Sequence, residues 1–300
     1  MGSTGAPGDD RLAALYFNPA ALAGGGFAVT VATGAAALTT PSGPSWDPAG
    51  QLQQIQRLLD RPDTTATPLA ARLSTMAGIG WQGSALALMG QGTARVEDGP
   101  SGLWGQVRVL SAIGLGAGWQ VDAPWLPARG LEGFVGTALR VLQVRQARKE
   151  TGDAAWQALT GYGYASDLGL LVRWRRFLEL GLAARDAAGS VAWQGAGGAS
   201  VGTTSWLFPA EGLTVDVALI GPPVAAARWQ GDGSWGVGVE QPVFGGVVAL
   251  RAGYRKDAVL GRASSAGVGL RAGPVRADVA VVIPETGSDL TLTAGAGLKF

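Results

Sequence analysis

The sequence contains no cysteine and no histidine. Thiol nucleophiles, His-based catalytic dyads and triads, and most zinc sites are excluded together, because each requires one of these side chains. Any catalysis would have to rest on carboxylates alone. We therefore expect a protein that is not an enzyme, with no metal site and no cofactor.

Charge is also scarce. Only 15% of residues are charged, the net charge is +1, and no dense basic cluster with interleaved aromatic residues occurs. We expect no nucleic-acid partner, because nucleic-acid binding needs a strongly basic surface. Hydrophobic residues make up 47% of the chain, yet no apolar run approaches the length of about 20 residues that a membrane-spanning helix requires. The hydrophobicity is therefore spread along the chain.

Glycine, in contrast, is abundant, with 49 residues. So much glycine would be costly in a helical protein, because glycine loses the most backbone freedom on folding. Tight turns, strand kinks and small positions facing the interior of a barrel accommodate it. The composition therefore favours an all-β protein.

The last stretch, residues 289–300, alternates between apolar and other side chains. One face of an extended strand would carry Leu290, Leu292, Ala294, Ala296, Leu298 and Phe300. In a soluble protein a terminal apolar edge is an aggregation hazard, whereas in a closed barrel the apolar face meets lipid and the edge pairs with the first strand. We interpret the chain as an antiparallel transmembrane β-barrel, with a soluble all-β sandwich or barrel as the alternative.

Alternation and turn residues predict about 14 strands, an even number as in single-chain bacterial barrels. The predicted spans are 26–38, 75–81, 85–96, 103–121, 131–145, 162–174, 177–186, 201–208, 213–219, 234–241, 246–255, 263–272, 275–283 and the final stretch. The long span 103–121 could contain a turn near residues 114–118.

The connections and the aromatic residues predict an orientation. Short connections such as 81–85 and 208–213 would lie at the periplasmic rim, and longer ones such as 187–200 and 220–233 at the outer rim. Aromatic residues near the strand ends would form two interfacial girdles, with Trp81, Trp125, Trp174, Trp206, Phe208, Phe244 and Phe300 at the periplasmic side and Trp104, Trp193, Trp229 and Trp235 at the outer side.

Two segments in the first long connection predict short helices. Asp47 and Pro48 are suited to begin a helix, and Leu52, Ile55, Leu58 and Leu59 follow on one of its faces. A second amphipathic stretch, residues 68–76, carries Leu69, Leu73 and Met76. These helices could form a lid over the barrel mouth or simply pack on its rim.

The predicted strands place charged residues opposite the apolar face. The charged positions expected to face the lumen include Asp167, Arg173, Glu179, Arg185, Asp216, Glu240, Arg251, Arg271 and Asp278. Burying them against lipid would cost several kcal/mol each near the midplane, so the register should keep them inside. They describe either a closed, salt-bridged interior or a water-lined or ligand-lined path.

The N-terminal residues 1–8 lack the basic and apolar regions of a signal peptide. Taken literally, this is a cytoplasmic start. Because the other features are those of an exported protein, we expect that a start methionine precedes a mature domain that resides in the bacterial outer membrane.

Two terminal motifs resemble those of a known family. Residues 9–23, with Asp9-Asp10, Tyr16 and Asn18-Pro19-Ala20, resemble the N-terminal hatch of FadL-like outer-membrane proteins, including the PorV-like and TraF-like branches. The residues Gly295, Leu298 and Phe300 resemble the C-terminal signal read by the barrel-assembly machinery.

The resemblance implies an N-terminal tail and plug over residues 1–25 and a barrel over residues 26–300, with a helical loop insert at 40–74. Phe17, Asn18, Pro19 and Ala20 would lie in the plug. The resemblance also implies a lateral opening at an inward kink of the third strand, for which Gly90 and Gly92 are the candidates.

This family resemblance implies a channel for passive uptake of small hydrophobic molecules, fatty-acid-like or aromatic, gated by displacement of the plug. Its partners would be membrane lipid and the small hydrophobic ligand. The alternative is a non-transporting, PorV-like barrel that docks another envelope or secretion component.

Overall fold

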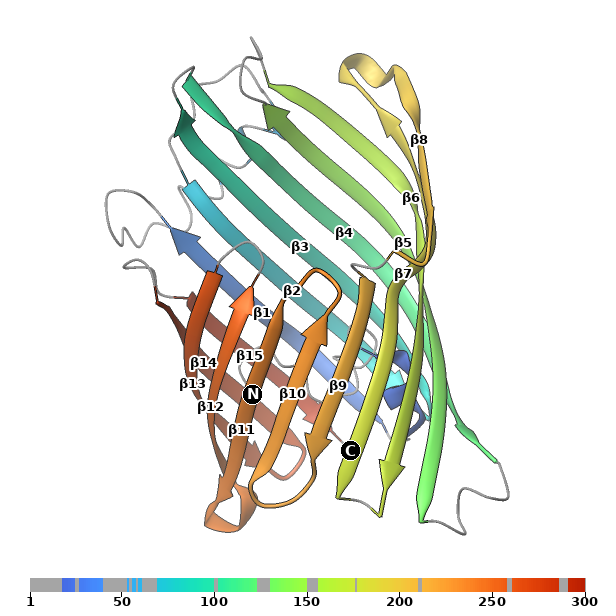
Figure 1. Ribbon diagram of the computed structural model, residues 1–300, viewed down its shortest axis with the longest axis vertical. Helices are drawn as coiled ribbons and strands as arrows, with labels where there is room; N and C mark the ends of the chain where they lie inside the picture. The colour runs from blue at the N-terminus through green and yellow to red at the C-terminus, as the bar shows by residue number, and fades with distance from the viewer. Residues whose placement is uncertain are drawn as a thin grey trace.

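The computed structural model describes residues 18–24, 27–39, 69–99, 102–122, 130–149, 156–175, 177–209, 212–257, 261–285 and 291–299, together with residues 53, 56, 57, 59 and 60. Within these ranges the chain is built almost entirely of antiparallel β-strands (Figure 1). None of the helices in the described part is long and apolar enough to cross a membrane.

A short 3-10 segment, η1 (Pro19–Gly24), precedes the strands. The strands are β1 (Ala28–Thr39), β2 (Leu69–Trp81), β3 (Ser84–Gly99), β4 (Gly102–Val121), β5 (Leu131–Lys149), β6 (Gln157–Trp174), β7 (Leu178–Gln194), β8 (Ser200–Leu207), β9 (Leu213–Leu219), β10 (Val224–Gln230), β11 (Trp235–Val243), β12 (Val248–Asp257), β13 (Gly261–Ala272), β14 (Val275–Pro284) and β15 (Thr291–Lys299).

The strands pair around the molecule in the order β6-β5-β4-β3-β2-β1-β15-β14-β13-β12-β11-β10-β9-β7-β8, and β6 pairs in addition with β7. The pairings therefore lead through fourteen strands and return to β6, whereas β8 pairs only with β7 among the described strands. The pairing of β1 with β15 confirms the expectation that the final strand adjoins the first.

Side chains alternate between the two faces of this wall. In β5, Phe134, Ala138 and Arg140 are buried inside, whereas Leu139 and Val141 are exposed outside. The same alternation of exposed apolar and buried residues recurs in β9 and β11. A continuous outward apolar surface is what a barrel in lipid presents.

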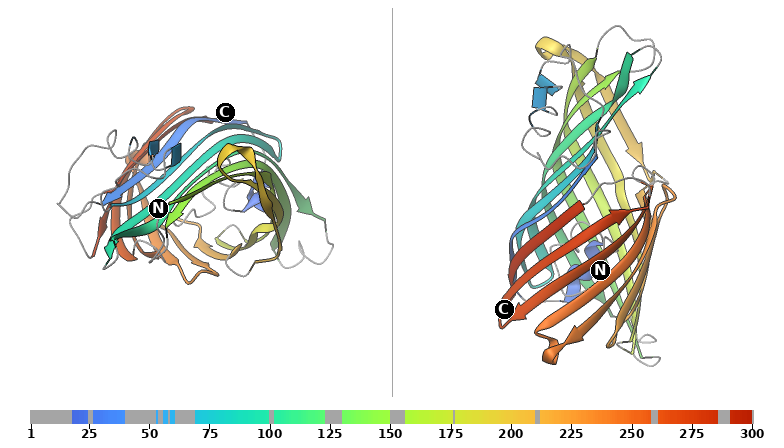
Figure 2. Two further views of the ribbon diagram at one scale, coloured as in Figure 1. Left: turned by 90° about the horizontal axis from the view of Figure 1, so that it is seen from above. Right: turned by 90° about the vertical axis from the view of Figure 1, so that its left-hand side faces the viewer.

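The wall has two heights, as Figure 1 and Figure 2 show. Strands β3 to β7 contain 16 to 20 residues, whereas β9 to β15 contain seven to twelve. The lower part of β7 pairs with β9 and its upper part with β8. Strands β8 and β9 thus share one edge of β7, with β8 along its upper part and β9 along its lower part. The tall wall rises above the short one.

Several predicted boundaries were wrong. Residues 69–76, predicted to be helical, belong to β2, because β1 and β3 bind the two edges of this segment. The predicted outer loop 220–233 contains β10, and most of the predicted loop 187–200 continues β7. The connection 208–213 is no periplasmic turn, because it joins β8 to β9 partway up the wall.

Strands β3 and β4 are regular. Strand β3 pairs with both neighbours without a register shift at Gly90 or Gly92, so the predicted kink in the third strand is wrong. Strand β4 likewise continues through residues 114–118, where a turn was considered.

Residues 53, 56, 57, 59 and 60 are helical, in agreement with the first predicted helix; the rest of that prediction lies outside the described residues. Leu59 is buried in a cluster with Val96 and Val107. Arg145 Nη2 lies 2.5 Å from Asp60 Oδ1. Val96 is on the same face of β3 as the outward Leu88, so these helical residues pack on the outer side of the tall wall rather than over the mouth.

Candidate functional site

The segment η1 lies on the inner face of the wall, against β4, β5 and β6 (Figure 2). Leu22 is buried in a cluster with Ala85, Ala87 and further residues of the inner face. Ala20, fully buried, packs below with Phe134 and Leu171. The segment η1 therefore packs against apolar residues both above and below it on the inner face.

A row of glycines makes room for η1. Gly118, Gly136 and Gly169 are directly paired across β4, β5 and β6, and we call them the glycine row. A Cβ atom at Gly136 would lie 2.3 Å from Ala20 N, and one at Gly169 would lie 2.1 Å from Asn18 Oδ1. Because such contacts are far inside van der Waals distance, any larger residue in this row would push η1 away.

Asn18 fixes the start of the segment. Its Nδ2 donates a hydrogen bond of 3.1 Å to the main-chain oxygen of Leu170, and its Oδ1 accepts one of 3.1 Å from Ala20 N. The second contact is a local turn of the type that asparagine favours. The amide side chain, which is buried, thereby ties η1 to the wall.

Two neighbouring rows of the inner face above η1 are apolar. One contains Leu110, Val144 and Trp193, and the other contains Met89, Leu142 and Val191; we call them the apolar rows. Trp206 of β8 packs against the same cluster. Trp193 and Trp206 therefore line the interior, and their assignment to the interfacial girdles was wrong.

Above the apolar rows the inner face becomes polar. Thr93, Arg108 and Gln146 occupy one row across β3, β4 and β5. Thr93 and Arg108 are exposed. The inner face thus changes from polar at the mouth to apolar and then to the glycine row.

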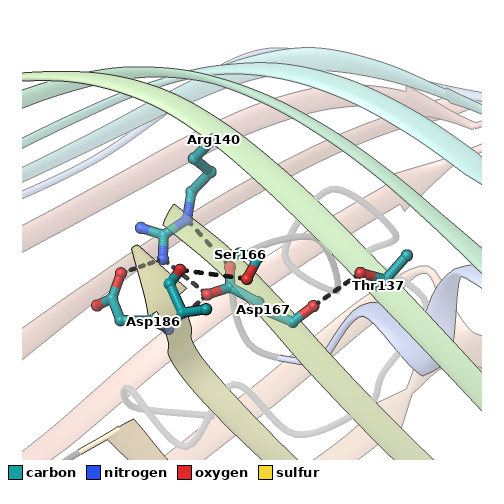
Figure 3. Close-up of polar contacts among 6 residues, drawn as sticks. Thr137, Arg140, Ser166, Asp167 and Asp186 are labelled. Carbon is teal, nitrogen blue, oxygen red and sulfur yellow. Dashed lines mark hydrogen bonds and ion pairs between the residues drawn. The ribbon is translucent and has the colours of Figure 1, made fainter. Parts of the chain in front are cut away.

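A buried ion-pair cluster lies between the apolar rows and the glycine row. Figure 3 shows its side chains, with Asp167 and Asp186 both directed toward Arg140. Arg140 donates to Asp167 through Nε at 3.0 Å and through Nη2 at 2.7 Å, and Nη2 also lies 2.7 Å from Asp186 Oδ1. Asp167 Oδ1 accepts a further 2.7 Å hydrogen bond from Asp186 N. The cluster joins β5, β6 and β7 at a point where three residues of β7 oppose Asp167.

Further ion pairs connect the inner face around the barrel. Arg228 Nε lies 2.5 Å from Asp216 Oδ1, and both side chains are buried. Arg173 pairs with Glu179 and Glu132 across β6, β7 and β5. Another set joins Glu240 to Arg251 and Arg271, and Arg251 also to Asp278.

These contacts bring most of the predicted lumen residues together. Asp167, Arg173, Glu179, Asp216, Glu240, Arg251, Arg271 and Asp278 all take part in the inner ion pairs. Arg185 is half-buried at the irregular part of β7. Phe17 and Phe300 lie outside the described residues, whereas Gly295 and Leu298 lie in β15.

The sequence prediction missed Arg140, Arg228 and the glycine row. Arg140 stands between Leu139 and Val141 in strict alternation, a signal that was present in the sequence. Arg228 lies in the unrecognised strand β10. The glycine row could not be found from sequence, because it depends on the pairing register of three strands.

No protein-family model and no curated protein matches the sequence. Several solved structures match the fold of the chain. A deltaS2 mutant of the TodX monoaromatic hydrocarbon channel matches with a TM-score of 0.56 at 11% identity, over 96% of this chain and 94% of that one. The CymD monoaromatic hydrocarbon channel matches with a TM-score of 0.56 at 12% identity, over 96% and 93% of the two chains.

The toluene transporter TbuX of Ralstonia pickettii matches with a TM-score of 0.55 at 12% identity, over 96% of this chain and 94% of that one. The chain has a FadL-like fold. At these identities the similarity concerns the fold. The FadL-like fold and the outward apolar surface assign the chain to the bacterial outer membrane.

Proposed function

We propose that the chain is an outer-membrane channel of FadL-like type for the passive uptake of small hydrophobic molecules, fatty-acid-like or aromatic. The segment from Asn18 to the end of η1 would act as its plug. The observation that carries this proposal is the placement of η1 on the glycine row, on the inner face below the apolar rows and the Arg140 ion-pair cluster.

Two properties of this arrangement support gating. The segment η1 is a separate piece of backbone that rests on the wall, and the hydrogen bond from Asn18 to the Leu170 oxygen ties it there. Such a neutral bond contributes only about 1 kcal/mol net. The wall itself is cross-linked by buried ion pairs, so the plug can move while the barrel keeps its shape.

Two properties support a hydrophobic cargo. The apolar rows offer Leu142, Val144 and Val191 on the path from the mouth to the plug. The solved structures of the same fold include channels described for monoaromatic hydrocarbons. A cargo of this kind would exchange water for apolar contacts on entering, at about 25 cal/mol per Å² of buried apolar surface.

The test uses uptake and conductance together. Gram-negative cells expressing the chain should take up a radiolabelled monoaromatic hydrocarbon or medium-chain fatty acid faster than cells without it. In planar bilayers, Asn18→Ala should open the purified channel severalfold more often than the unsubstituted chain, because the tie to Leu170 is lost. Gln143→Ala, on the outer face of β5, is the control.

A second candidate is a non-transporting barrel that docks another envelope component. The ion pairs across the inner face favour it, because they resemble a filled and rigid interior. It predicts no uptake and no conductance for either the unsubstituted chain or Asn18→Ala, together with a stoichiometric envelope protein that remains bound through purification. Uptake above background would contradict it.

A further inference from the structure

Four large side chains lie in one row on the outward face near the top of the short wall. Trp229 pairs with Trp235, Trp235 with Lys256, and Lys256 with Arg262, across β10, β11, β12 and β13. All four are exposed. We call them the upper outward row.

This row marks the upper edge of the apolar surface. Below it, the outward faces carry Val237, Leu250 and Val268, each more than 40% exposed. Phe244 and Val247 are exposed at the opposite end. Strand β12 has ten residues, which at about 3.3 Å per residue and a tilt of about 40° span about 25 Å, the height of the apolar band of an outer-membrane barrel.

The upper outward row places two tryptophans beside two positively charged side chains. Tryptophan concentrates at the level of the lipid headgroups, and the ring of Trp235 also lies 5.6 Å from that of Tyr254. Lys256 and Arg262 are directly opposite each other on neighbouring strands. Like charges in that arrangement repel and destabilise the pairing unless an anion is present.

In the part of the chain that the structure describes, Glu285 and Asp257 are the carboxylates beside this pair, and Asp257 directly follows Lys256 in β12. Glu285 follows β14 on the far side of Arg262, where its main-chain nitrogen donates to the Arg262 oxygen. Its Oε1 accepts the 2.7 Å hydrogen bond of the Tyr254 hydroxyl. The Glu285 carboxylate therefore lies beside Arg262 and Tyr254, whereas the row itself carries the two positive charges of Lys256 and Arg262.

We propose that the upper outward row binds a phosphate group of an anionic glycolipid in the outer leaflet. Arg262 can donate two parallel hydrogen bonds to a phosphate, and Lys256 adds a point charge. The acyl chains would lie on the apolar surface below, along Leu250 and Val268. This continuity favours a lipid over a free phosphate ion. The site faces outward and is independent of the plug and of the proposed transport.

The experiment measures lipid binding to the full chain. The purified barrel is placed in neutral detergent with a bis-phosphorylated glycolipid of the lipid A type, and bound lipid is counted by native mass spectrometry. The double variant K256Q/R262Q should bind the glycolipid about thirtyfold more weakly, in line with about 1 kcal/mol for each basic residue near an anionic lipid surface. Arg108→Gln, which removes a positive charge from the inner face, should bind it unchanged.

The remaining outcomes of the experiment each support or overturn the proposed lipid site. A dephosphorylated glycolipid should bind the unsubstituted chain about as weakly as the phosphorylated one binds the double variant, and millimolar inorganic phosphate should not displace the phosphorylated glycolipid. Equal binding of the phosphorylated lipid by the double variant would overturn the site. Displacement by inorganic phosphate alone would overturn the assignment to a lipid. The mobility shift of the folded barrel on boiling confirms that the variants are folded.

Discussion

Asn18 is the single asparagine of the chain. Both ends of its amide are used, one toward the Leu170 oxygen and one toward Ala20 N. An aspartate in its place would lose the donor, and an alanine would lose both contacts. The residue is therefore specified by the chemistry of the contact between η1 and the wall.

Arg140 allows a stability prediction. Arg140→Met should lower the free energy of unfolding by about 3–5 kcal/mol, because it leaves the buried Asp167 without its cation. The double variant R140M/D167L should recover most of this loss. Urea unfolding in detergent, followed by tryptophan fluorescence, measures both. Equal midpoints for the single variant and the unsubstituted chain would show that the pair contributes little.

Residue-level prediction from sequence succeeded where alternation was strict. Asp216 stands between two valines, and Glu240 follows the alternating Val237 and Val239, so their inward direction followed from strand periodicity alone. The ion-pair partners of these two carboxylates could not be predicted from strand periodicity. The pairing of Asp216 with Arg228 requires β9 and β10 to be in register, and this register depends on a strand that the sequence did not reveal.

At the level of elements, the contact between η1 and the glycine row can be tested by adding one methyl group. Gly136→Ala should displace η1, because the new Cβ would lie 2.3 Å from Ala20 N. Channel opening in planar bilayers should rise severalfold. Gly221→Ala is the matched control, since no atom lies within 4 Å of its Cβ position. Unchanged opening in Gly136→Ala would mean that η1 does not block the path.

The elements that sequence reasoning misjudged have identifiable reasons. Strand β10 is rich in alanine, which has low β propensity, and it follows two prolines. The start of β2 is composed of residues that favour helices when isolated, but pairing on both edges outweighs that preference. The upper part of β7 contains Asp186 and Gly189, which are typical of loops.

At the level of the whole molecule, the lipid-facing surface predicts how depth changes the effect of a charge. Val279, 51% exposed on the outward face of β14, lies near its middle, and Ile283 lies near its upper end. Val279→Arg should destabilise the barrel by about 2–4 kcal/mol in lipid, and Ile283→Arg by about 0–1 kcal/mol.

Reversible unfolding in lipid vesicles measures this difference. Equal losses at the two positions would contradict the orientation of β14 in the membrane.

The overall architecture, in contrast to individual contacts, was accessible from the sequence. Scattered hydrophobicity, abundant glycine and an alternating terminal strand all follow from a wall with one face in lipid.

The unequal height of the wall has a consequence for the direction of approach. The rim over β10 to β14 ends near the upper outward row, whereas β3 to β7 continue beyond it. Among the described residues, the concave side of the tall strands, with Trp193 and Trp206, therefore lies above the rim of the short strands, and this rim is at the height of the lipid headgroups. Under the proposed function, a hydrophobic solute that collects at the membrane surface would reach this side directly from the lipid.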